Sequence, residues 1–152
     1  MLFRSYGSAG NGASGHMAAE LFKSMAGVRM QHVPYKGGVL ALNDLVAGQI
    51  QAVFDSLVGS ASLVQAGKLR AIAVAGNKRS AMLPEVPTFE EAGLPGYDAG
   101  TWFGILAPAA TPQPVIERLR NETVKVIALP DIKARFDSLA LDARSGTPDD
   151  FR

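Results

Sequence analysis

The sequence predicts an α/β fold with a parallel-rich sheet flanked by helices, followed by a C-terminal helical segment. Short strand-like apolar runs alternate with helical stretches from residue 6 to residue 75, and glycines mark the ends of the helical stretches. The connections are short enough for strand–helix–strand crossovers, in which successive strands run parallel. A chain of 152 residues with 47% hydrophobic residues is not disordered, because it can bury a core.

The pattern of the first half of the chain predicts three strand–loop–helix units followed by a final strand. A glycine-rich loop over residues 7–15 follows a strand at Tyr6 and leads into a helix over 14–25, which Gly27 ends. The pattern of 69–75 is the clearest strand of all. The other expected elements are a strand at 30–34, a helix at 39–46, a strand at 50–54 and a helix from Ser56, as its cap, to Ala66.

The second half of the chain has a different character. Five of the nine prolines fall between Pro84 and Pro112, which predicts a loop-rich segment with one short helix opened by a capping box, Thr88-x-x-Glu91. A strand is expected at 101–107. The remaining expected elements are a helix from Pro112 or Pro114 to Leu129 that buries Val115, Leu119, Val126 and Ile127, a helix at 131–139, and the start of another at 145–150.

Charge and composition exclude several classes of protein. Residues 1–80 carry eight Lys/Arg and three Asp/Glu (+5) and residues 81–152 carry seven and eleven (−4), for a net charge of +1. The basic half has no Lys/Arg stripe with interleaved aromatic residues, so it favours a small anion rather than nucleic acid.

Without cysteine there is no disulfide framework. No apolar run or N-terminal segment predicts a membrane span or signal peptide, so we expect a soluble chain without a targeting segment.

The glycine-rich loop is the sharpest functional feature. A Gly/Ser loop between a strand and a helix presents free backbone N–H groups and the positive end of the helix dipole, which suits a carboxylate or phosphate. The spacing of Gly7, Gly10 and Gly12 matches neither the dinucleotide fingerprint nor the P-loop. A plain turn is the alternative. The candidate binding residues are Ser8, Ala9, Gly10, Asn11, Gly12, Ala13 and Ser14.

The hydroxyl and imidazole groups near this loop have several interpretations. A nucleophile elbow of the form Gly-x-Ser-x-Gly is absent, so hydrogen-bond donation to an anion is the functional interpretation of Ser8 and Ser14. His16 is a candidate binding residue; alternatively it is a capping or core-packed imidazole. His32 lies within a strand and is expected to be structural. The two histidines, 16 residues apart without a carboxylate pattern, predict no metal site.

The next two strands also end in candidate binding residues. Tyr35, Lys36 and Gly37 follow the second strand, and Asp55 follows the third. Because the carboxyl ends of parallel strands share one edge, we expect these residues to converge with the glycine-rich loop. Lys36 would reach an anion or be a solvated turn lysine. Asp55 would accept a hydrogen bond from a ligand hydroxyl or ammonium, or cap the next helix.

A set of short segments resembles one known family. The segments are YGSAGNG (6–12), His16 with AELF (19–22), HVPYKG (32–37), FD (54–55), GKLRA (67–71), KRS (78–80), LPEVPT (83–88), EAGLPGY (91–97) and WFG (102–104). In order and spacing, they resemble the substrate-binding receptors of tripartite tricarboxylate transporters, the Bordetella-uptake-gene (Bug) family. The resemblance covers residues 5–151.

The resemblance implies a type II periplasmic-binding-protein fold, in which two α/β domains close on a carboxylated solute for membrane subunits of a transporter. It implies ligands such as citrate, other dicarboxylates, amino acids or nicotinate-like acids, with no catalysis and no cofactor. Residues 5–100 would be ligand-binding domain two, and 101–152 the segment that returns to domain one. The loop over 8–14 would be the carboxylate cradle, and Tyr35, Lys36 and Asp55 would lie near the cleft.

Two departures from the family qualify this resemblance. Family receptors are periplasmic and about twice as long, so we expect an N-terminal truncation that removes the export signal and part of domain one. We then expect weak or absent solute binding by the isolated chain, exposed apolar surface on 102–129, and dimerisation or segment swapping. The second departure is local: Ala13 and Gly15 stand where hydroxyl residues are frequent in the family.

Two rival functions use the same residues. A Rossmann-like enzyme domain would bind a nucleotide or cofactor through the glycine-rich loop, but its second strand would end in an acidic residue to hold a ribose, and here Tyr35 and Lys36 follow it. An effector-sensing domain of a regulator would share the binding fold. Such a protein carries a helix-turn-helix or signalling domain, and none is present in these 152 residues.

Overall fold

The computed structural model describes residues 4–101, 103–138, 141, 143, 145–147 and 150. The chain divides into two compact units, Met1–Thr101 and Trp102–Arg152. Among the described residues, no helix has both the length and the apolar character needed to cross a membrane.

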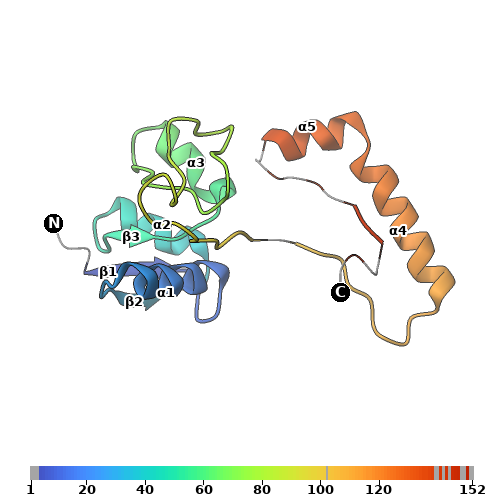
Figure 1. The fold of residues 1–152 in the computed structure, drawn as a ribbon, viewed down its shortest axis with the longest axis horizontal. Coiled ribbons are helices and arrows are strands. Elements are labelled where there is room, and N and C mark those ends of the chain that lie inside the picture. Colours follow the sequence, from blue (N-terminus) through green and yellow to red (C-terminus); the bar gives the residue numbers. More distant parts are fainter. Residues whose placement is uncertain are drawn as a thin grey trace. The chain divides into compact units, whose positions relative to one another are not determined.

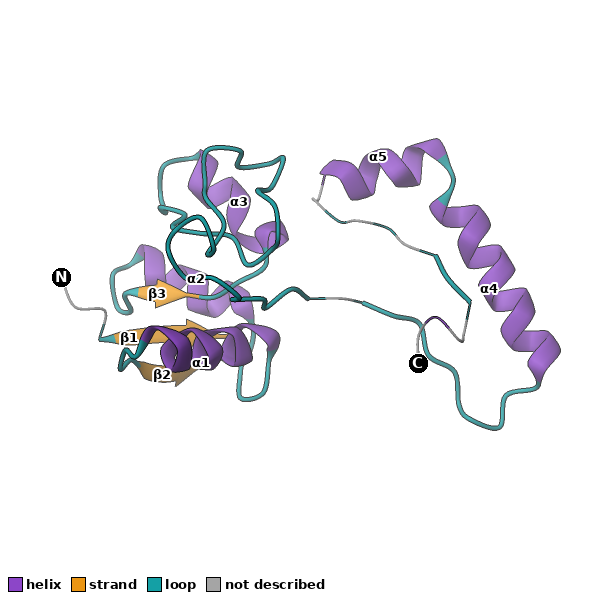
Figure 2. Ribbon diagram, viewed as in Figure 1, coloured by secondary structure: helices purple, strands orange, loops and turns teal. Residues whose placement is uncertain are grey.

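The first unit is built on a three-stranded parallel sheet (Figure 1; Figure 2). Its strands are β1 (Ser5–Ser8), β2 (Gln31–Pro34) and β3 (Ala52–Val53), in the spatial order β2-β1-β3. In register, Tyr6 of the central strand lies beside His32 on one side and Ala52 on the other. The connecting helices are α1 (Ser14–Ala26), α2 (Gly38–Val46) and α3 (Leu57–Gln65). The predicted α/β class with parallel strands is confirmed.

The helix boundaries of this unit follow local signals in the sequence. α1 ends at Gly27, which adopts a left-handed φ of 65° and donates its N–H to the carbonyl of Lys23, as the prediction requires. Ser56 occupies the N-cap position of α3, although its side chain makes no capping hydrogen bond. β2 and β3 are shorter than the strands predicted at 30–34 and 50–54, β3 most of all, because only residues with a paired neighbour form a ladder.

The strand predicted at 69–75 is wrong. The segment forms only one isolated parallel bridge, between Val74 and Thr88, through hydrogen bonds from Val74 N–H to Pro87 O (2.9 Å) and from Phe89 N–H to Val74 O (3.2 Å). Apolar alternation favours an extended backbone, but a strand needs a partner of similar length. Among the described residues, the segment 84–97, called the proline-rich stretch below, provides a partner at one position only.

The short helix predicted after Thr88 is also wrong, although its capping box forms. The N–H of Thr88 donates to Glu91 Oε2 (2.8 Å), and the N–H of Glu91 donates to Thr88 Oγ1 (3.1 Å). The backbone then closes a single turn, in which Ala92 donates to the carbonyl of Thr88 at 3.0 Å and Gly93 follows at a positive φ. Gly93, Pro95 and Gly96 prevent the turn from growing into a helix.

An aromatic cluster attaches this proline-rich stretch to α1. Phe22 of α1 contacts Phe54, Phe89 and Tyr97, with ring centroids 5.6, 5.8 and 6.5 Å apart. Tyr97 is 5% exposed. The cluster joins residues far apart in the sequence and covers one side of the helix whose N-terminus lies at the candidate site.

The second unit contains α4 (Gln113–Ile127) and α5 (Pro130–Ser138). Pro112 is the N-cap residue of α4 and Pro114 lies in its first turn, as predicted. The strand predicted at 101–107 is not formed at residues 103–107, because the described part of this unit has no strand to pair with it. Trp102 and residues 148–149, within the helix predicted at 145–150, lie outside the described residues.

The buried face predicted for α4 is wrong. Val115, Leu119 and Val126 are 46%, 52% and 49% exposed, and neither α4 nor α5 has a buried residue. Phe103, Ile105 and Leu106 are more exposed still. The apolar pattern of α4 is therefore that of a helix that packs on a surface, and the described part of the second unit does not cover it. The exposed apolar surface expected on this segment is confirmed for its described residues.

Candidate functional site

Three helix N-termini lie at one edge of the sheet. Because β1, β2 and β3 are parallel, their carboxyl ends share an edge, and α1, α2 and α3 begin there. None of these helices has an acidic residue in its first turn, and the N-cap residues Ala13, Gly37 and Ser56 make no side-chain capping hydrogen bond. The first N–H groups of a helix have no acceptor within it, and the helix dipole places partial positive charge there. This edge therefore favours an anion.

The segment Ser8–Ser14, called loop 8–14 below, lies between β1 and α1. Gly10 and Gly12 have φ angles of 136° and 75°, which other residues rarely adopt, and Ala13 N–H donates to Gly10 O at 3.2 Å. These two glycines allow the chain to reverse direction within the loop. The residues with exposed surface at this point are Ala9, Asn11, Gly12 and Ser14. In α1 the first helical bond runs from Met17 N–H to Ala13 O (3.0 Å), so the N–H groups of Ser14, Gly15 and His16 have no acceptor within the helix.

Ser8 stabilises loop 8–14 through hydrogen bonds of its buried side chain. It is 1% exposed, and its Oγ lies 2.7 Å from His32 Nε2 and 3.0 Å from Gly10 O. Its Oγ also accepts the N–H of Gly10 at 3.2 Å. The hydroxyl predicted as a donor to an anion is thus engaged within the protein, and it shapes the loop.

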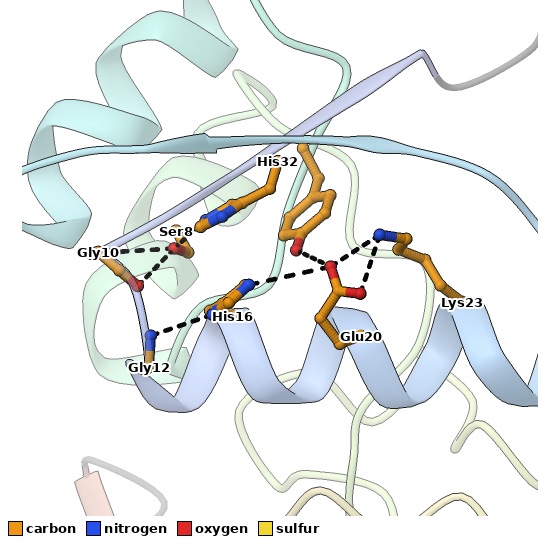
Figure 3. A network of polar contacts seen from close by, with 8 residues as sticks. Ser8, Gly10, Gly12, His16, Glu20, Lys23 and His32 are labelled. Atoms are coloured by element: carbon orange, nitrogen blue, oxygen red, sulfur yellow. Dashed lines mark hydrogen bonds and ion pairs between the residues drawn. The ribbon is translucent and has the colours of Figure 1, made fainter.

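His16 supports the same loop from the first turn of α1 (Figure 3). The N–H of Gly12 donates to His16 Nδ1 at 3.0 Å. The His16 ring stacks on His32 with centroids 4.1 Å apart and planes 10° apart, and His32 stacks on Tyr6 at 4.9 Å. This geometry matches the capping alternative for His16. The prediction that His32 is structural left out its contact with Ser8, which arises from the register of β1 and β2.

Glu20 completes the network one turn further along α1 (Figure 3). Its carboxylate accepts a 2.5 Å hydrogen bond from the Tyr6 phenol and pairs with Lys23 Nζ at 2.7 Å. The hydrogen bonds from Lys23 and Tyr6 lower the pKa of Glu20, so it is a carboxylate at neutral pH. Burial, together with the neighbouring His16, lowers the pKa of His32 and favours its neutral form.

The turn after β2 lies against loop 8–14. Tyr35 donates its N–H to Ser8 O at 3.0 Å, and a Cβ on Gly10 would lie 3.4 Å from Tyr35 O. The Tyr35 phenol donates to Asp44 at 2.7 Å, and this bond raises the pKa of Tyr35. Lys36 is exposed, and Gly37, at a φ of 130°, is the N-cap residue of α2.

Asp55 follows β3 and lies between the first turns of α2 and α3. A Cβ on Gly38 would lie 3.0 Å from its Oδ1, and a Cβ on Gly59 would lie 2.7 Å from its Oδ2. The residue as a whole has exposed surface, yet its carboxyl is closely surrounded, and this burial raises its pKa against the opposing hydrogen bond from Ser56 N–H. Asp55 is thus a carboxyl group held at an otherwise positive edge.

Gly15 is required by the packing of α1 on the end of β3. A Cβ on Gly15 would overlap the carbonyl oxygen of Phe54. A serine at this position would carry the same Cβ and would have to displace the backbone of Phe54. The carboxyl-end edge of the sheet brings together loop 8–14, Tyr35–Gly37 and Asp55. Among the described residues, no three His, Cys, Asp or Glu side chains are grouped to hold a metal ion.

Comparison with known proteins gives consistent matches. The family model described as "Tripartite tricarboxylate transporter family receptor" matches residues 4–150. A UPF0065 protein in the tcbD-tcbE intergenic region of Pseudomonas sp. (strain P51) is 42% identical over 146 residues, which are 95% of this chain and 44% of that protein.

Two solved structures resemble the chain in fold and sequence. R. palustris Rpa4515 with adipate has a TM-score of 0.89 and 34% identity, and the match covers 99% of this chain and 50% of that chain. MatC (Rpa3494) from Rhodopseudomonas palustris with bound malate has a TM-score of 0.83 and 31% identity, over 90% and 47% of the two chains. The chain spans about half the length of these three proteins.

Proposed function

Because the chain belongs to the tripartite tricarboxylate transporter receptor family, we propose that it binds a small dicarboxylate as a ligand-binding domain of a periplasmic solute receptor. The family resemblance found in the sequence is confirmed. This is a family of solute receptors and not of enzymes, and neither the Rossmann-like enzyme nor the regulator alternative is supported. Adipate and malate, the ligands of the two similar structures, are both dicarboxylates.

The observation that supports this proposal is the set of three helix N-termini at the edge of the sheet that holds loop 8–14, where no N-cap side chain makes a capping hydrogen bond. Backbone N–H groups that point at a carboxylate form charge-assisted hydrogen bonds, which are stronger than neutral ones. The exposed residues of the loop and the first turn of α1 offer several such groups within a few residues. One carboxylate of the solute would be bound there, with Tyr35, Lys36 and Gly37 beside it.

Asp55 would select among dicarboxylates. A carboxyl at this edge repels a second anionic group of the solute unless one of the two carries a proton. It would instead accept a hydrogen bond from a solute hydroxyl or ammonium group. Solutes that place such a group near Asp55 would bind better than unsubstituted dicarboxylates of the same length.

We propose the remaining roles by analogy with the family. We assign residues 5–100 to ligand-binding domain two and residues 101–152 to the segment that returns to domain one. Membrane subunits of a tripartite transporter would be the partners of the receptor. A second copy of this chain would cover the exposed apolar side chains of α4, by dimerisation or segment swapping.

The proposal is tested by titrating the ¹⁵N-labelled 152-residue chain with adipate and malate at pH 7, because NMR detects even millimolar binding. We expect shifts in the backbone amides of loop 8–14 and the first turn of α1, and none with 1,6-hexanediol, which lacks carboxylates. Ser14→Glu places a negative charge at the N-terminus of α1 and should abolish the shifts. Ser24→Glu adds the same charge in the last turn of α1 and is the matched control. Shifts that map elsewhere, or that survive Ser14→Glu, would overturn the proposal.

A further inference from the structure

We propose that the stacked pair His16 and His32 positions loop 8–14, and that the loop keeps its geometry only while His16 Nδ1 carries no proton. The inference deepens the proposed function, since it concerns the loop to which we assign carboxylate binding. It makes the two histidines positioning residues, which act through the loop backbone.

The imidazoles contact the loop at two points. Gly12 N–H donates to His16 Nδ1 at 3.0 Å, which requires a lone pair on that nitrogen and hence a neutral ring with its hydrogen on Nε2. His32 Nε2 lies 2.7 Å from Ser8 Oγ at the start of the loop. Because the rings stack at 4.1 Å, the position of one fixes the position of the other. The two contacts therefore hold the loop between Ser8 and Gly12 as a unit.

Two charged groups lie beside the pair. Glu20 Oε1 lies 3.9 Å from His16 Nε2. Lys23 pairs with both oxygens of Glu20 at 2.7 and 2.9 Å, and Glu20 also accepts a hydrogen bond from Tyr6. Two positively charged rings stacked at 4.1 Å would repel each other.

Protonation of His16 has a definite structural consequence. Histidine is the side chain that changes charge between pH 5 and 8. A second proton on His16 can be placed only on Nδ1, where it would face the N–H of Gly12, so a hydrogen bond becomes a contact between two donors. Gly12 would lose its acceptor, and the loop would open at acidic pH.

The experiment follows the Gly12 amide and the His16 ring by NMR from pH 8 to pH 5 without solute. We expect both to titrate with one midpoint, while the amide of Gly27, which donates to Lys23 O, stays constant. In His16→Asn the side-chain oxygen accepts near the position of Nδ1 but does not titrate, so Gly12 should become independent of pH. In His16→Ala the Gly12 amide should exchange with solvent about 10-fold faster at pH 8. A Gly12 signal that ignores the His16 titration in the wild-type chain would overturn the inference.

Adipate binding separates this inference from the proposed function. At pH 8 we expect His16→Ala to bind adipate about 10-fold more weakly than the wild-type chain, and His16→Asn to restore most of that loss. Equal affinity in all three would overturn the positioning role. If none of them binds adipate while Gly12 still titrates with His16, the proposed function fails and the control of the loop by the histidine pair stands.

Discussion

The phenol of Tyr97 donates a 2.9 Å hydrogen bond to the backbone carbonyl of Ala18, 79 residues earlier in the chain. Tyr97 also packs on Phe89 with ring centroids 4.1 Å apart. These contacts attach the proline-rich stretch to the middle of α1, the helix whose first turn borders loop 8–14. Residues 89–97 thus help to fix the position of α1, which borders the candidate site.

Stability should fall at high pH because Tyr97 must remain neutral. Burial raises the pKa of Tyr97 from 10.0 to about 12, so the folded state holds the phenol proton more tightly than the unfolded state does. Its contribution to stability is fully present below pH 10 and is lost as the pH rises through 12. Urea unfolding from pH 9 to 12 should show a steeper loss for the wild-type chain than for Tyr97→Phe. Equal slopes would contradict this, since the two chains differ in no titratable group other than Tyr97.

The contact between Gly15 and Phe54 predicts a large effect of one methyl group. In Gly15→Ala the new Cβ must displace the Phe54 carbonyl, which should lower the free energy of unfolding by about 1–3 kcal/mol. Gly76→Ala is the matched control, because a Cβ there lies 3.5 Å from its nearest neighbour. Its free energy of unfolding should change by less than about 1 kcal/mol. Chemical denaturation of both variants provides the measurement, and similar midpoints would show that α1 can shift away from β3.

Local signals explain why the first 65 residues could be predicted. The apolar spacing of α1, its stop at Gly27 and the strand-to-helix turns after β1, β2 and β3 depend on neighbours in sequence. The convergence of Ser8, Tyr35 and Asp55 then follows from parallel strands alone. The strand prediction for residues 69–75 was wrong because a strand also needs a partner strand. Whether one is available depends on the path of the proline-rich stretch.

The contacts within the site could not be predicted in the same way. The link between Ser8 and His32 depends on the register of β1 and β2, and a shift of one residue would turn His32 to the other face of the sheet. The spacing of His16, Glu20 and Lys23 along one face of α1 was visible in the sequence. The stacking of His16 on His32 could not be predicted from this spacing, because it depends on the packing of α1 on the sheet.

Asp55 should reduce stability at neutral pH. Its raised pKa means that the folded protein disfavours the carboxylate, so Asp55→Asn should raise the free energy of unfolding slightly at pH 7. Because the folded state binds the Asp55 proton more tightly than the unfolded state does, the difference between the two chains should shrink as the pH falls toward 3.8, the ordinary pKa of an aspartate. Thermal unfolding at pH 7 and pH 4 measures both effects. A less stable Asp55→Asn chain at pH 7 would instead show that the carboxylate anchors α2 and α3.

The exposed face of α4 should cause self-association of the 152-residue chain. An apolar stripe runs along α4, made of Val115, Leu119 and Val126, which recur at helical spacing and are about half exposed. Association with a partner that removes this stripe from water is favourable. Leu119→Lys places a charge in the stripe and should shift the mass measured by light scattering toward the 16.0 kDa monomer. Asn121→Lys adds the same charge to α4 outside the stripe and should leave the mass unchanged. A wild-type chain that is monomeric at high concentration would contradict this prediction, and it would mean that the stripe is too small to hold two copies together.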